Sequence, residues 1–333
     1  MNLASQILTI LMDQPGETLS GQRLADTFAV SRNAIWKTIK QLNQEGYQIT
    51  SQGRSGYQLE KLYQRADSRQ LQALLCHEPA LPAIHIAVHD QVTSTNDLAK
   101  QFLIDHPQDI GLFISHQQTA GRGRQGRPFN SNLSHGLYFS LAFGPKQADP
   151  QLISLYTIAA ATACCQALAP YLDQELKIKW VNDLFYQKRK VAGILCEGIT
   201  DLENMRVSGL LVGIGLNLAG DFSQADPAIQ KVAGTLFGHH LPDNFNENQF
   251  LASFLVYFYQ YHKELAKKAF IPYYSDHLLG RGQRVSYQSA GQEEQGVILG
   301  INDMGHLLID QGQGEVKELM SGEVHFGSQQ FTS

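Results

Sequence analysis

Cysteine is scarce in this 333-residue sequence, and its four copies do not have the spacing of metal ligands. Cys164 and Cys165 are adjacent within an apolar run, so we interpret the thiols as structural and the compartment as reducing. The 12 histidines are scattered and form no His-x-x-x-His pair on a predicted helix. The sequence therefore predicts no metal site made from protein side chains.

The sequence also has no excess of positive charge. Its formal net charge is -5, and charged residues make up only 17% of the chain. This balance excludes a uniformly basic nucleic-acid-binding protein, so any DNA contact must be a local patch. The N-terminus has no basic segment ahead of an apolar core, and we expect no later stretch to reach the roughly 18 uncharged apolar residues of a membrane span. We therefore predict a cytoplasmic protein without membrane contact, and its length suggests two or three domains.

The first 62 residues have the pattern of a self-contained helical unit. Apolar residues recur at helical spacing from Leu3 to Leu11 and end before Pro15, which closes a first helix together with the glycine after it. Ser20 and Ser31 are suited to cap a second helix to about residue 28 and a third helix to about residue 43. Three short helices with a tight turn before the third predict a helix-turn-helix.

The third helix has an apolar stripe on one face and polar or basic residues on the other. Residues 47–51 and 57–59 then alternate like strands around a basic, glycine-flanked tip, which predicts the wing of a winged helix-turn-helix. A merely solvated polar face is the alternative, but cations on both the helix and the wing favour phosphate contacts. The predicted DNA-binding residues are Ser31, Arg32, Asn33, Trp36, Lys37, Lys40 and Arg54.

After a polar stretch at residues 61–69, which we interpret as a linker, strands and helices alternate to about residue 270. Strand-like segments occur at 84–88, 112–115, 137–141 and 207–218, and helix-like segments at 151–169 and 247–268. Such a mixture predicts an α/β or α+β domain with helices against one sheet. Beyond Pro272, four short strands between glycine-rich turns predict a small β-barrel.

Three glycines and three arginines interleave between Gly121 and Arg127. Glycine lets backbone N–H groups approach a ligand and arginine binds phosphate bidentately, so this composition is typical of an anion-binding loop. No Gly-Lys-Ser/Thr follows, and the glycine spacing is not that of a dinucleotide-binding turn. Taken alone, the segment also fits an Arg-Gly nucleic-acid patch or an ordinary basic surface loop.

Three further segments place polar or small residues next to predicted strands. Asn182 and Asp183 follow one strand, and Lys190 starts the next, where its charge can meet a carboxylate or a phosphate. A surface hairpin with solvated cations is the alternative. Ser94 begins a Ser-Thr-Asn segment that can bind a ligand or simply cap the next helix. Residues 213–217 end a strand with small residues, as a close approach between backbone and ligand requires.

Together these segments resemble one family, the biotin–protein ligases, and the helical head is similar to that of bifunctional bacterial biotin operon repressors. The family pattern Ser-Thr-Asn, Gln-x-x-Gly-Arg-Gly-Arg-x-Gly-Arg, Lys-Trp-Pro-Asn-Asp with Lys-x-x-Gly-Ile-Leu, and Gly-x-Gly-x-Asn occurs here in order, with Val181 in place of the proline. The resemblance implies an α+β protein. It would have a winged helix-turn-helix at 1–62, a mixed-sheet catalytic domain similar to class II synthetases at 68–270, and an SH3-like β-barrel at 271–327.

The resemblance also implies a role for each matching residue. Lys190 meets the biotin carboxylate and then the phosphoanhydride, Arg124 holds the adenylate phosphate, and Asp183 orients Lys190 or assists the later amine attack. Gln118 binds the ureido end of biotin. The complete biotin and adenylate site that the resemblance implies comprises Ser94, Thr95, Asn96, Gln118, Gly121, Arg122, Gly123, Arg124, Arg127, Lys190, Gly193, Gly213 and Asn217.

Two departures from the family pattern accompany these roles. We expect Val181 only to relax the local backbone, and no tryptophan near residues 231–234 is available to cover the adenine.

The implied reaction joins biotin to ATP as biotinyl-5′-adenylate with release of pyrophosphate. A lysine of biotin carboxyl carrier protein, an acetyl-CoA carboxylase subunit, then displaces AMP. Mg²⁺ is expected with ATP, and the adenylate-bound protein is expected to form a homodimer that binds operator DNA and represses transcription. A lipoate ligase and a ligand-sensing repressor without catalysis are the alternatives. The complete Gly-Arg loop and the head favour biotin over lipoate, and Asp183 and Lys190 argue against a loss of catalysis.

Overall fold

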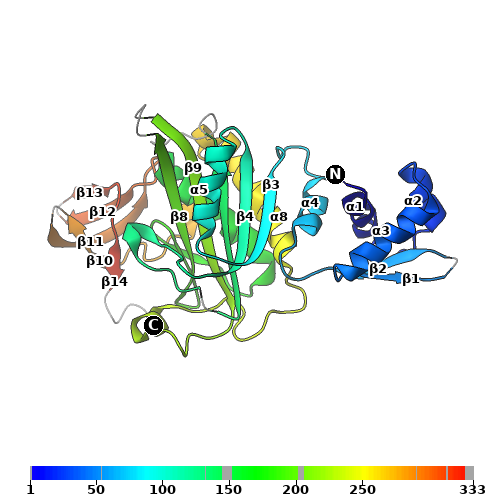
Figure 1. The fold of residues 1–333 in the computed structure, drawn as a ribbon. Helices are drawn as coiled ribbons and strands as arrows, with labels where there is room; N and C mark the ends of the chain where they lie inside the picture. The colour runs from blue at the N-terminus through cyan, green and yellow to red at the C-terminus, as the bar shows by residue number, and fades with distance from the viewer. Residues whose placement is uncertain are drawn as a thin grey trace. The chain divides into compact units, whose positions relative to one another are not determined.

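The structure is a computed structural model that describes residues 2–53, 55–131, 133–144, 152–201, 206–289, 291–312 and 314–326. The chain forms two compact units, Met1–Pro82 with Phe245–Ser253 and Ala83–Asn244 with Phe254–Ser333, and each is described by itself (Figure 1). The boundary at Pro82 lies later in the chain than the end of the predicted head at residue 62, because a fourth helix belongs to the first unit.

The first unit contains the predicted helices and hairpin: α1 (Leu3–Asp13), α2 (Gly21–Thr27), α3 (Arg32–Gln44), β1 (Gln48–Ser51) and β2 (Tyr57–Lys61). Asn2, Ser20 and Ser31 each accept a hydrogen bond from the backbone N–H three residues later, which satisfies a donor at the start of each helix. The hairpin strands pair antiparallel. The predicted helix-turn-helix with its wing is confirmed.

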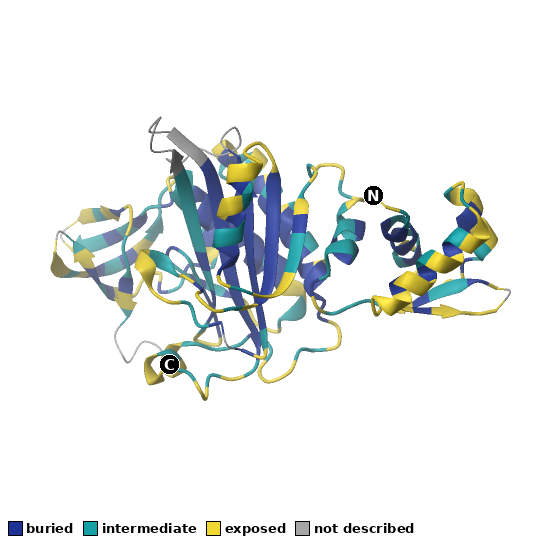
Figure 2. Ribbon diagram, in the orientation of Figure 1, coloured by how far each residue is buried: buried dark blue, intermediate teal, exposed yellow. Residues whose placement is uncertain are grey.

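One face of α3 is buried and the other is exposed to solvent (Figure 2). Ile35, Ile39 and Leu42 are at most 3% exposed and pack in one core with Leu8 and Leu24. The predicted DNA-binding side chains on this helix all lie on the exposed face: Ser31, Arg32, Asn33, Trp36, Lys37 and Lys40. Arg54 at the tip of the wing lies outside the described residues.

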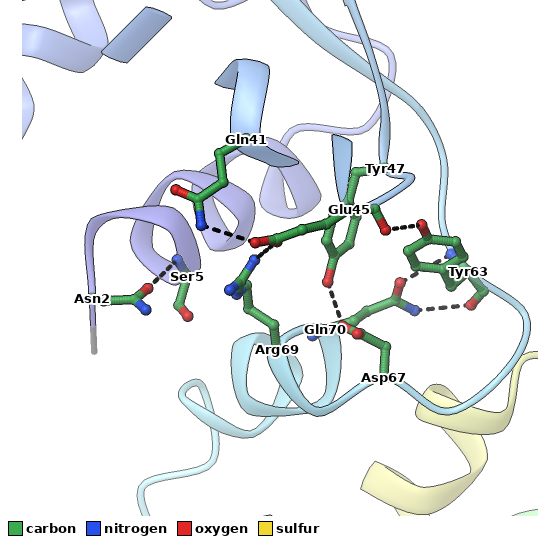
Figure 3. A network of polar contacts seen from close by, with 9 residues as sticks. All are labelled: Asn2, Ser5, Gln41, Glu45, Tyr47, Tyr63, Asp67, Arg69 and Gln70. Carbon is green, nitrogen blue, oxygen red and sulfur yellow. Dashed lines mark hydrogen bonds and ion pairs between the residues drawn. The ribbon is translucent and has the colours of Figure 1, made fainter. Parts of the chain in front are cut away.

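The polar stretch that the sequence assigns to a linker is hydrogen-bonded to the end of α3 (Figure 3). The hydroxyl of Tyr63 donates to the backbone carbonyl of Glu45 at 2.8 Å, and Tyr47 donates to Asp67. Asp67 caps α4 (Ser68–Leu75), and Arg69 on that helix forms an ion pair with Glu45. These contacts connect the third helix of the helix-turn-helix to the segment that follows the wing.

The same stretch is also hydrogen-bonded to the first turn of α8 (Glu247–Lys263). The Ala66 N–H donates to the Glu247 carboxylate at 2.7 Å, and the Asp67 N–H donates to the Asn248 side chain at 2.7 Å. Glu247 is 1% exposed and Asn248 is fully buried. Because these bonds fix backbone donors between residues 61 and 69, the stretch does not behave as a free linker.

The second unit is built on a seven-stranded mixed sheet of order β3-β4-β5-β9-β8-β7-β6, in which β3 and β4 pair in parallel and the other neighbours pair antiparallel. The strands are β3 (His85–Val92), β4 (Ile110–Gln118), β5 (His135–Phe143), β6 (Lys177–Lys179), β7 (Asp183–Tyr186), β8 (Arg189–Asp201) and β9 (Arg206–Ala219). The four strands predicted in this region are confirmed; three extend beyond the predicted bounds at both ends, and the first begins one residue later and ends four residues later than predicted.

Helices cover both faces of this sheet. On one face, Ala99 and Leu103 of α5 (Thr95–Asp105) pack on Phe113 of β4. On the other, Phe254 of α8 meets Phe139 of β5 edge to face at 5.2 Å between ring centroids. The remaining helical segments are η1 (Arg124–Gly126), α6 (Ile153–Leu168), η4 (Ala169–Tyr171), α7 (Pro227–Val232), η5 (Leu265–Lys267) and α9 (Ile271–Asp276).

Two expectations about these helices are corrected. The predicted helix at 247–268 ends at Lys263, because η5 follows and Lys268 adopts a left-handed φ of 53°. Residues Ile153–Tyr171 are long and apolar enough by composition to cross a membrane, contrary to the expectation that no stretch is. Within the domain, 72% of this apolar stretch is buried, which is typical of a core helix.

The C-terminal part is a five-stranded antiparallel sheet of order β13-β12-β11-β10-β14. Its strands are β10 (Arg284–Ser289), β11 (Gln292–Ile301), β12 (Leu307–Gly312), β13 (Glu315–Leu319) and β14 (Val324–Phe326), of which the last was not predicted. Among the residues that the structure describes, no pairing of β13 with β14 closes this sheet. The indole N–H of Trp180 donates to Gly305 O at 2.9 Å and so connects this sheet to the seven-stranded one.

Candidate active site

A pocket of about 190 Å³ lies where the predicted chemical segments meet. It is bounded by the N-terminus of α5, the end of β4, the loop after it, the β6–β7 turn and the middle of β8 and β9. The predicted site residues that line it are Ser94, Thr95, Asn96, Gln118, Arg122, Gly123, Arg124, Arg127, Asp183, Lys190, Gly193 and Gly213. Tertiary structure therefore brings together motifs that are spread over the chain from Ser94 to Gly213.

The α5 side of the pocket is a buried polar wall. Ser94, Thr95 and Asn96 are each at most 5% exposed. The amide oxygen of Gln118 accepts from the backbone N–H of Thr95 at 2.8 Å and lies 3.2 Å from the hydroxyl of Thr95. Ser94 occupies the N-cap position of α5 without a side-chain capping bond, so capping alone does not explain a buried serine at this place.

Each arginine of the predicted anion-binding loop has a partner within the protein. Arg122 pairs with Asp97, and Arg127 pairs with Glu323 at 2.9 Å. Arg124 donates to the side chain of Asn182 at 3.3 Å and to the carbonyl of Gly322 at 3.4 Å. An anionic ligand must therefore replace existing partners when it binds these guanidinium groups.

The loop's turn requires glycine at only one of its three glycine positions. Gly126 has a left-handed φ of 72°, which glycine adopts without strain, and Gln125 before it has a φ of 57°. The Gly123 N–H donates to the carbonyl of Arg127 at 2.7 Å, which closes the loop on itself.

Asp183 and Lys190 lie on the neighbouring antiparallel strands β7 and β8, where Asp183 is opposite Gly193 and Lys190 is opposite Phe185. The Lys190 ammonium is 2.7 Å from an Asp183 carboxylate oxygen, so the two groups form an ion pair. Nearby, burial lowers the pKa of Lys179, although Asp183 and Glu323 oppose that shift. The pocket thus places lysine and arginine side chains around the carboxylates of Asp183 and Glu323.

Glycines in the sheet make room for protein side chains in the pocket. A Cβ atom on Gly215 would lie 2.7 Å from the ring of Phe129, and one on Gly193 would lie 3.0 Å from the same ring. A Cβ atom on Gly213 would lie 2.2 Å from the amide oxygen of Asn96. A close approach of a ligand was expected at Gly213, whereas the group directly over it is the Asn96 side chain.

Gly121 and Asn217 are predicted site residues that do not line the pocket. Gly121 begins the loop, and an added Cβ there would be 2.9 Å from the amide nitrogen of Gln118. Asn217 is 5% exposed and its carbonyl accepts from the Leu236 N–H at 2.9 Å. Residues 231–234 include no tryptophan that could cover the adenine. This segment lies beside the start of β8, where the Gly234 N–H donates to the Lys190 carbonyl oxygen at 2.9 Å.

Sequence reasoning missed several residues that touch the site. Phe129, Gly322 and Glu323 all line the pocket, as does Asn182, which the sequence marked only as a polar residue after a strand. Burial alone would raise the pKa of Glu323, but Arg127 and Lys179 outweigh burial and hold that pKa below its usual range. Glu323 lies next to β14, which is far from the other motifs in sequence and has only three residues, so no local pattern marks it. The peptide bond between Trp180 and Val181 is cis.

Comparisons with known proteins cover most of the chain. Three families match successive parts: "HTH domain" over residues 4–58, "Biotin/lipoate A/B protein ligase family" over residues 88–217, and "Biotin protein ligase C terminal domain" over residues 281–327. A "Bifunctional ligase/repressor BirA" from Bacillus subtilis (strain 168) is 27% identical over 331 residues, which are 98% of this chain and 99% of the relative.

A protein of the same name from Escherichia coli (strain K12) is 28% identical over 322 residues, which are 94% of each chain. A solved structure described as "Biotin protein ligase from Aquifex aeolicus in complex with biotin and ATP" matches with a TM-score of 0.57 and 25% identity. That match covers 72% of this chain and 97% of the solved chain.

Proposed function

Since this chain belongs to the biotin/lipoate A/B protein ligase family and carries a helix-turn-helix head, we propose that it is a biotin–protein ligase that also represses transcription. One observation carries the ligase half of this proposal. The Gly-Arg loop, the Asp183–Lys190 ion pair and the buried Ser-Thr-Asn wall line a single pocket. That pocket offers cations for a phosphate next to a neutral polar wall for an uncharged ring.

In the first half-reaction, the biotin carboxylate attacks the α-phosphate of ATP and pyrophosphate leaves. Holding two anions in contact is the main task of the protein, because positioning and charge neutralisation supply most of the catalysis in phosphoryl chemistry. Lys190, Arg122 and Arg124 supply the positive charge. Lys190 leaves Asp183, and Arg122 leaves Asp97, to bind the ligand.

In the second half-reaction, a lysine amine of the carrier attacks the acyl carbon of biotinyl-adenylate and AMP leaves. The amine must be neutral to attack. Once Lys190 binds the phosphate, the Asp183 carboxylate is released from its ion pair and accepts a proton from the incoming amine. The exchange of partners at Lys190 thus links the two half-reactions.

We also propose that Mg²⁺ enters bound to ATP. Within the described residues, no group of three His, Cys, Asp or Glu side chains is arranged to hold a metal. Mg²⁺ commonly takes most of its ligands from substrate phosphates and water, and Asp183 and Glu323 are carboxylates that line the pocket. The ion's contribution is to neutralise phosphate charge.

A transfer assay tests the ligase proposal. The full chain is incubated with labelled biotin, ATP, Mg²⁺ and the apo carrier domain of acetyl-CoA carboxylase, and label on the carrier is measured. Lipoate replaces biotin in a matched reaction. We expect label from biotin and no carrier modification from lipoate, and modification by lipoate alone would replace this proposal with a lipoate ligase.

For the repressor half, we propose that Ser31, Arg32, Asn33, Trp36, Lys37, Lys40 and Arg54 contact operator DNA, and that the adenylate-bound protein binds as a homodimer. A helix-turn-helix usually reads two half-sites through a two-fold dimer. The adenylate orders the loop from Gly121 to Arg127 by replacing its internal partners, which leaves a changed surface for the second subunit. Apo carrier competes for the adenylate and so relieves repression.

Sedimentation and operator binding test this second half. We expect the dimer fraction and the operator affinity to rise together when biotin and ATP are added. A chain without residues 1–62 is expected to lose operator binding, and a truncated chain that still shifts operator DNA would refute the winged-helix assignment. We retain 1–62, 68–270 and 271–327 as the functional divisions and a cytoplasmic location, where carrier and operator both occur.

A further inference from the structure

We propose that Glu197, which lies behind the pocket wall, fixes the direction of the hydrogen bonds in that wall and so makes it an acceptor of ligand N–H groups. The inference rests on the proposed biotin site. Glu197 is a positioning residue in this proposal, because it acts through Asn96, Ser140 and Thr95 and is not among the residues that line the pocket.

The sheet brings these four residues together. In the register of β5 and β8 with the strand between them, Ser140 and Leu195 both lie opposite Gly213. Glu197 is two residues beyond Leu195 and therefore lies on the same face of β8. Asn96 in the first turn of α5 lies directly over Gly213, where a Cβ atom would leave it no space.

The first link is between Glu197 and Asn96. The side-chain nitrogen of Asn96 lies 2.6 Å from a carboxylate oxygen of Glu197. An ionised carboxylate only accepts hydrogen bonds, so the Asn96 NH₂ group must face Glu197 and its amide oxygen must face away. The charge on Glu197 thus chooses one of the two possible orientations of the Asn96 amide.

The second link runs through Ser140, which is fully buried. Its hydroxyl oxygen lies 2.5 Å from the Asn96 amide oxygen and 2.7 Å from the Thr95 hydroxyl oxygen. The Asn96 oxygen has no proton, so the single Ser140 proton must lie between these two oxygens. The Thr95 hydroxyl must then donate to Ser140, because no other proton is available for the 2.7 Å hydrogen bond.

The pocket wall is left with unused lone pairs as a result. Because the Thr95 proton is engaged with Ser140, the Gln118 amide oxygen accepts only from the backbone N–H of Thr95. Thr95 and Gln118 both line the pocket, and in this arrangement the Thr95 hydroxyl oxygen and the Gln118 amide oxygen, which lie 3.2 Å apart, keep free acceptor capacity. A cyclic urea has ring N–H donors, and this wall is complementary to them.

Binding measurements on the full chain test the relay with two ligands. One is biotin, and the other is an isosteric analogue in which ring oxygens replace both ring N–H groups. Glu197→Met removes the acceptor for Asn96, so the amide can turn and Thr95 becomes a donor. We expect biotin to bind roughly tenfold more weakly to this variant, while binding of the analogue changes by less than about twofold.

Three further variants and one control variant separate the relay from a structural role. Ser140→Ala interrupts the series of hydrogen bonds and should reduce the preference for biotin over the analogue. The double variant Glu197→Met/Ser140→Ala should reduce that preference no further than either single variant does. Glu197→Gln retains an acceptor oxygen and should restore most of the preference for biotin. Glu293→Met, at an exposed position on β11, is the matched control and should change the binding of neither ligand.

The relay would be overturned if Glu197→Met weakened the binding of both ligands equally, or if it weakened the binding of neither. The same holds if Ser140→Ala leaves the ligand preference intact, which covers the case in which Glu197→Met does not fold. A native chain that binds neither ligand would instead contradict the biotin site itself, so the two failures are distinguishable.

Discussion

The cations of α3 and the cations of the Gly-Arg loop differ in their partners. In the described part of the chain, no ion pair engages Arg32, Lys37 or Lys40, and the Lys40 ammonium lies 5.3 Å from the centroid of the Trp36 ring. Each loop arginine, by contrast, is held by a side chain or a carbonyl of the protein. The helix can bind DNA phosphates by releasing counterions alone, whereas the loop must exchange one partner for another.

This difference has a physical consequence for selectivity. Binding through unpaired surface cations is strong for any polyanion and weakens with salt. Binding through paired cations succeeds only for a ligand that takes the place of the protein partners in the same geometry. The head is therefore suited to a long regular polymer, and the pocket is suited to one small anion.

The largest effect is expected from Lys190→Ala, which removes the pocket lysine that is paired with Asp183. A single charge directed at a developing anion is commonly worth about 3 kcal/mol, so pyrophosphate exchange should fall by a factor of about 100 or more. Thermal unfolding controls for the fold. Exchange within threefold of the native rate would contradict the role of Lys190.

Removing the unpaired cations of α3 should have the next largest effect. The triple variant Arg32→Ala/Lys37→Ala/Lys40→Ala should weaken operator binding. It should also reduce the slope of log affinity against log salt by about 0.9 for each phosphate that the protein no longer neutralises. Biotin transfer to the carrier should be unchanged and serves as the control. A variant with the native salt slope would show that these side chains do not meet phosphates.

The pairing of Arg122 can be tested from both sides. Arg122→Gly should let biotinyl-adenylate escape into solution, while its synthesis persists in part, because a loop arginine retains the intermediate. Asp97→Asn should do the reverse and slow adenylate release by a few-fold, since Arg122 no longer has to leave an anionic partner. Release rates from a rapid-dilution experiment distinguish the two, and equal release from both variants would exclude partner exchange.

The smallest effect is expected in the head, at the ion pair between Arg69 and Glu45 (Figure 3). Burial alone would raise the pKa of Glu45, but hydrogen bonds from Gln41 and Arg69 outweigh burial and lower it. A lowered carboxylate pKa stabilises the fold above its unfolded pKa of about 4.3, and that stability is lost as the pH falls through the folded pKa.

Arg69→Met should therefore cost about 0.5 kcal/mol or less at neutral pH, because the pair is partly exposed. The cost should shrink as the solution is acidified below about pH 4.3. Urea unfolding at several pH values measures it. A cost that stays constant down to acid pH would mean that packing of the Arg69 side chain, and not its charge, supplies the stabilisation.

Much of the fold could be predicted because local patterns dominate it. The serines at residues 20 and 31 mark helix starts directly, and the nearly continuous apolar stretches of β4, β5 and β9 are long enough to mark these strands. Predictions failed where the signal was short or nonlocal. β14 has only three residues, and the predicted linker is held by the first turn of α8, about 180 positions later in the chain.

The sequence by itself determined the identity of the chemical groups: three loop arginines, a lysine at a strand start, an amide at the end of β4 and an exposed basic helix face. Each is written in contiguous residues whose spacing is set by the helix or strand period. Only the tertiary structure decided which groups are paired in the resting protein. Glu197 meets Asn96 across 101 residues, and Arg127 meets Glu323 across 196 residues. Such pairings depend on strand order and register, which no local pattern contains.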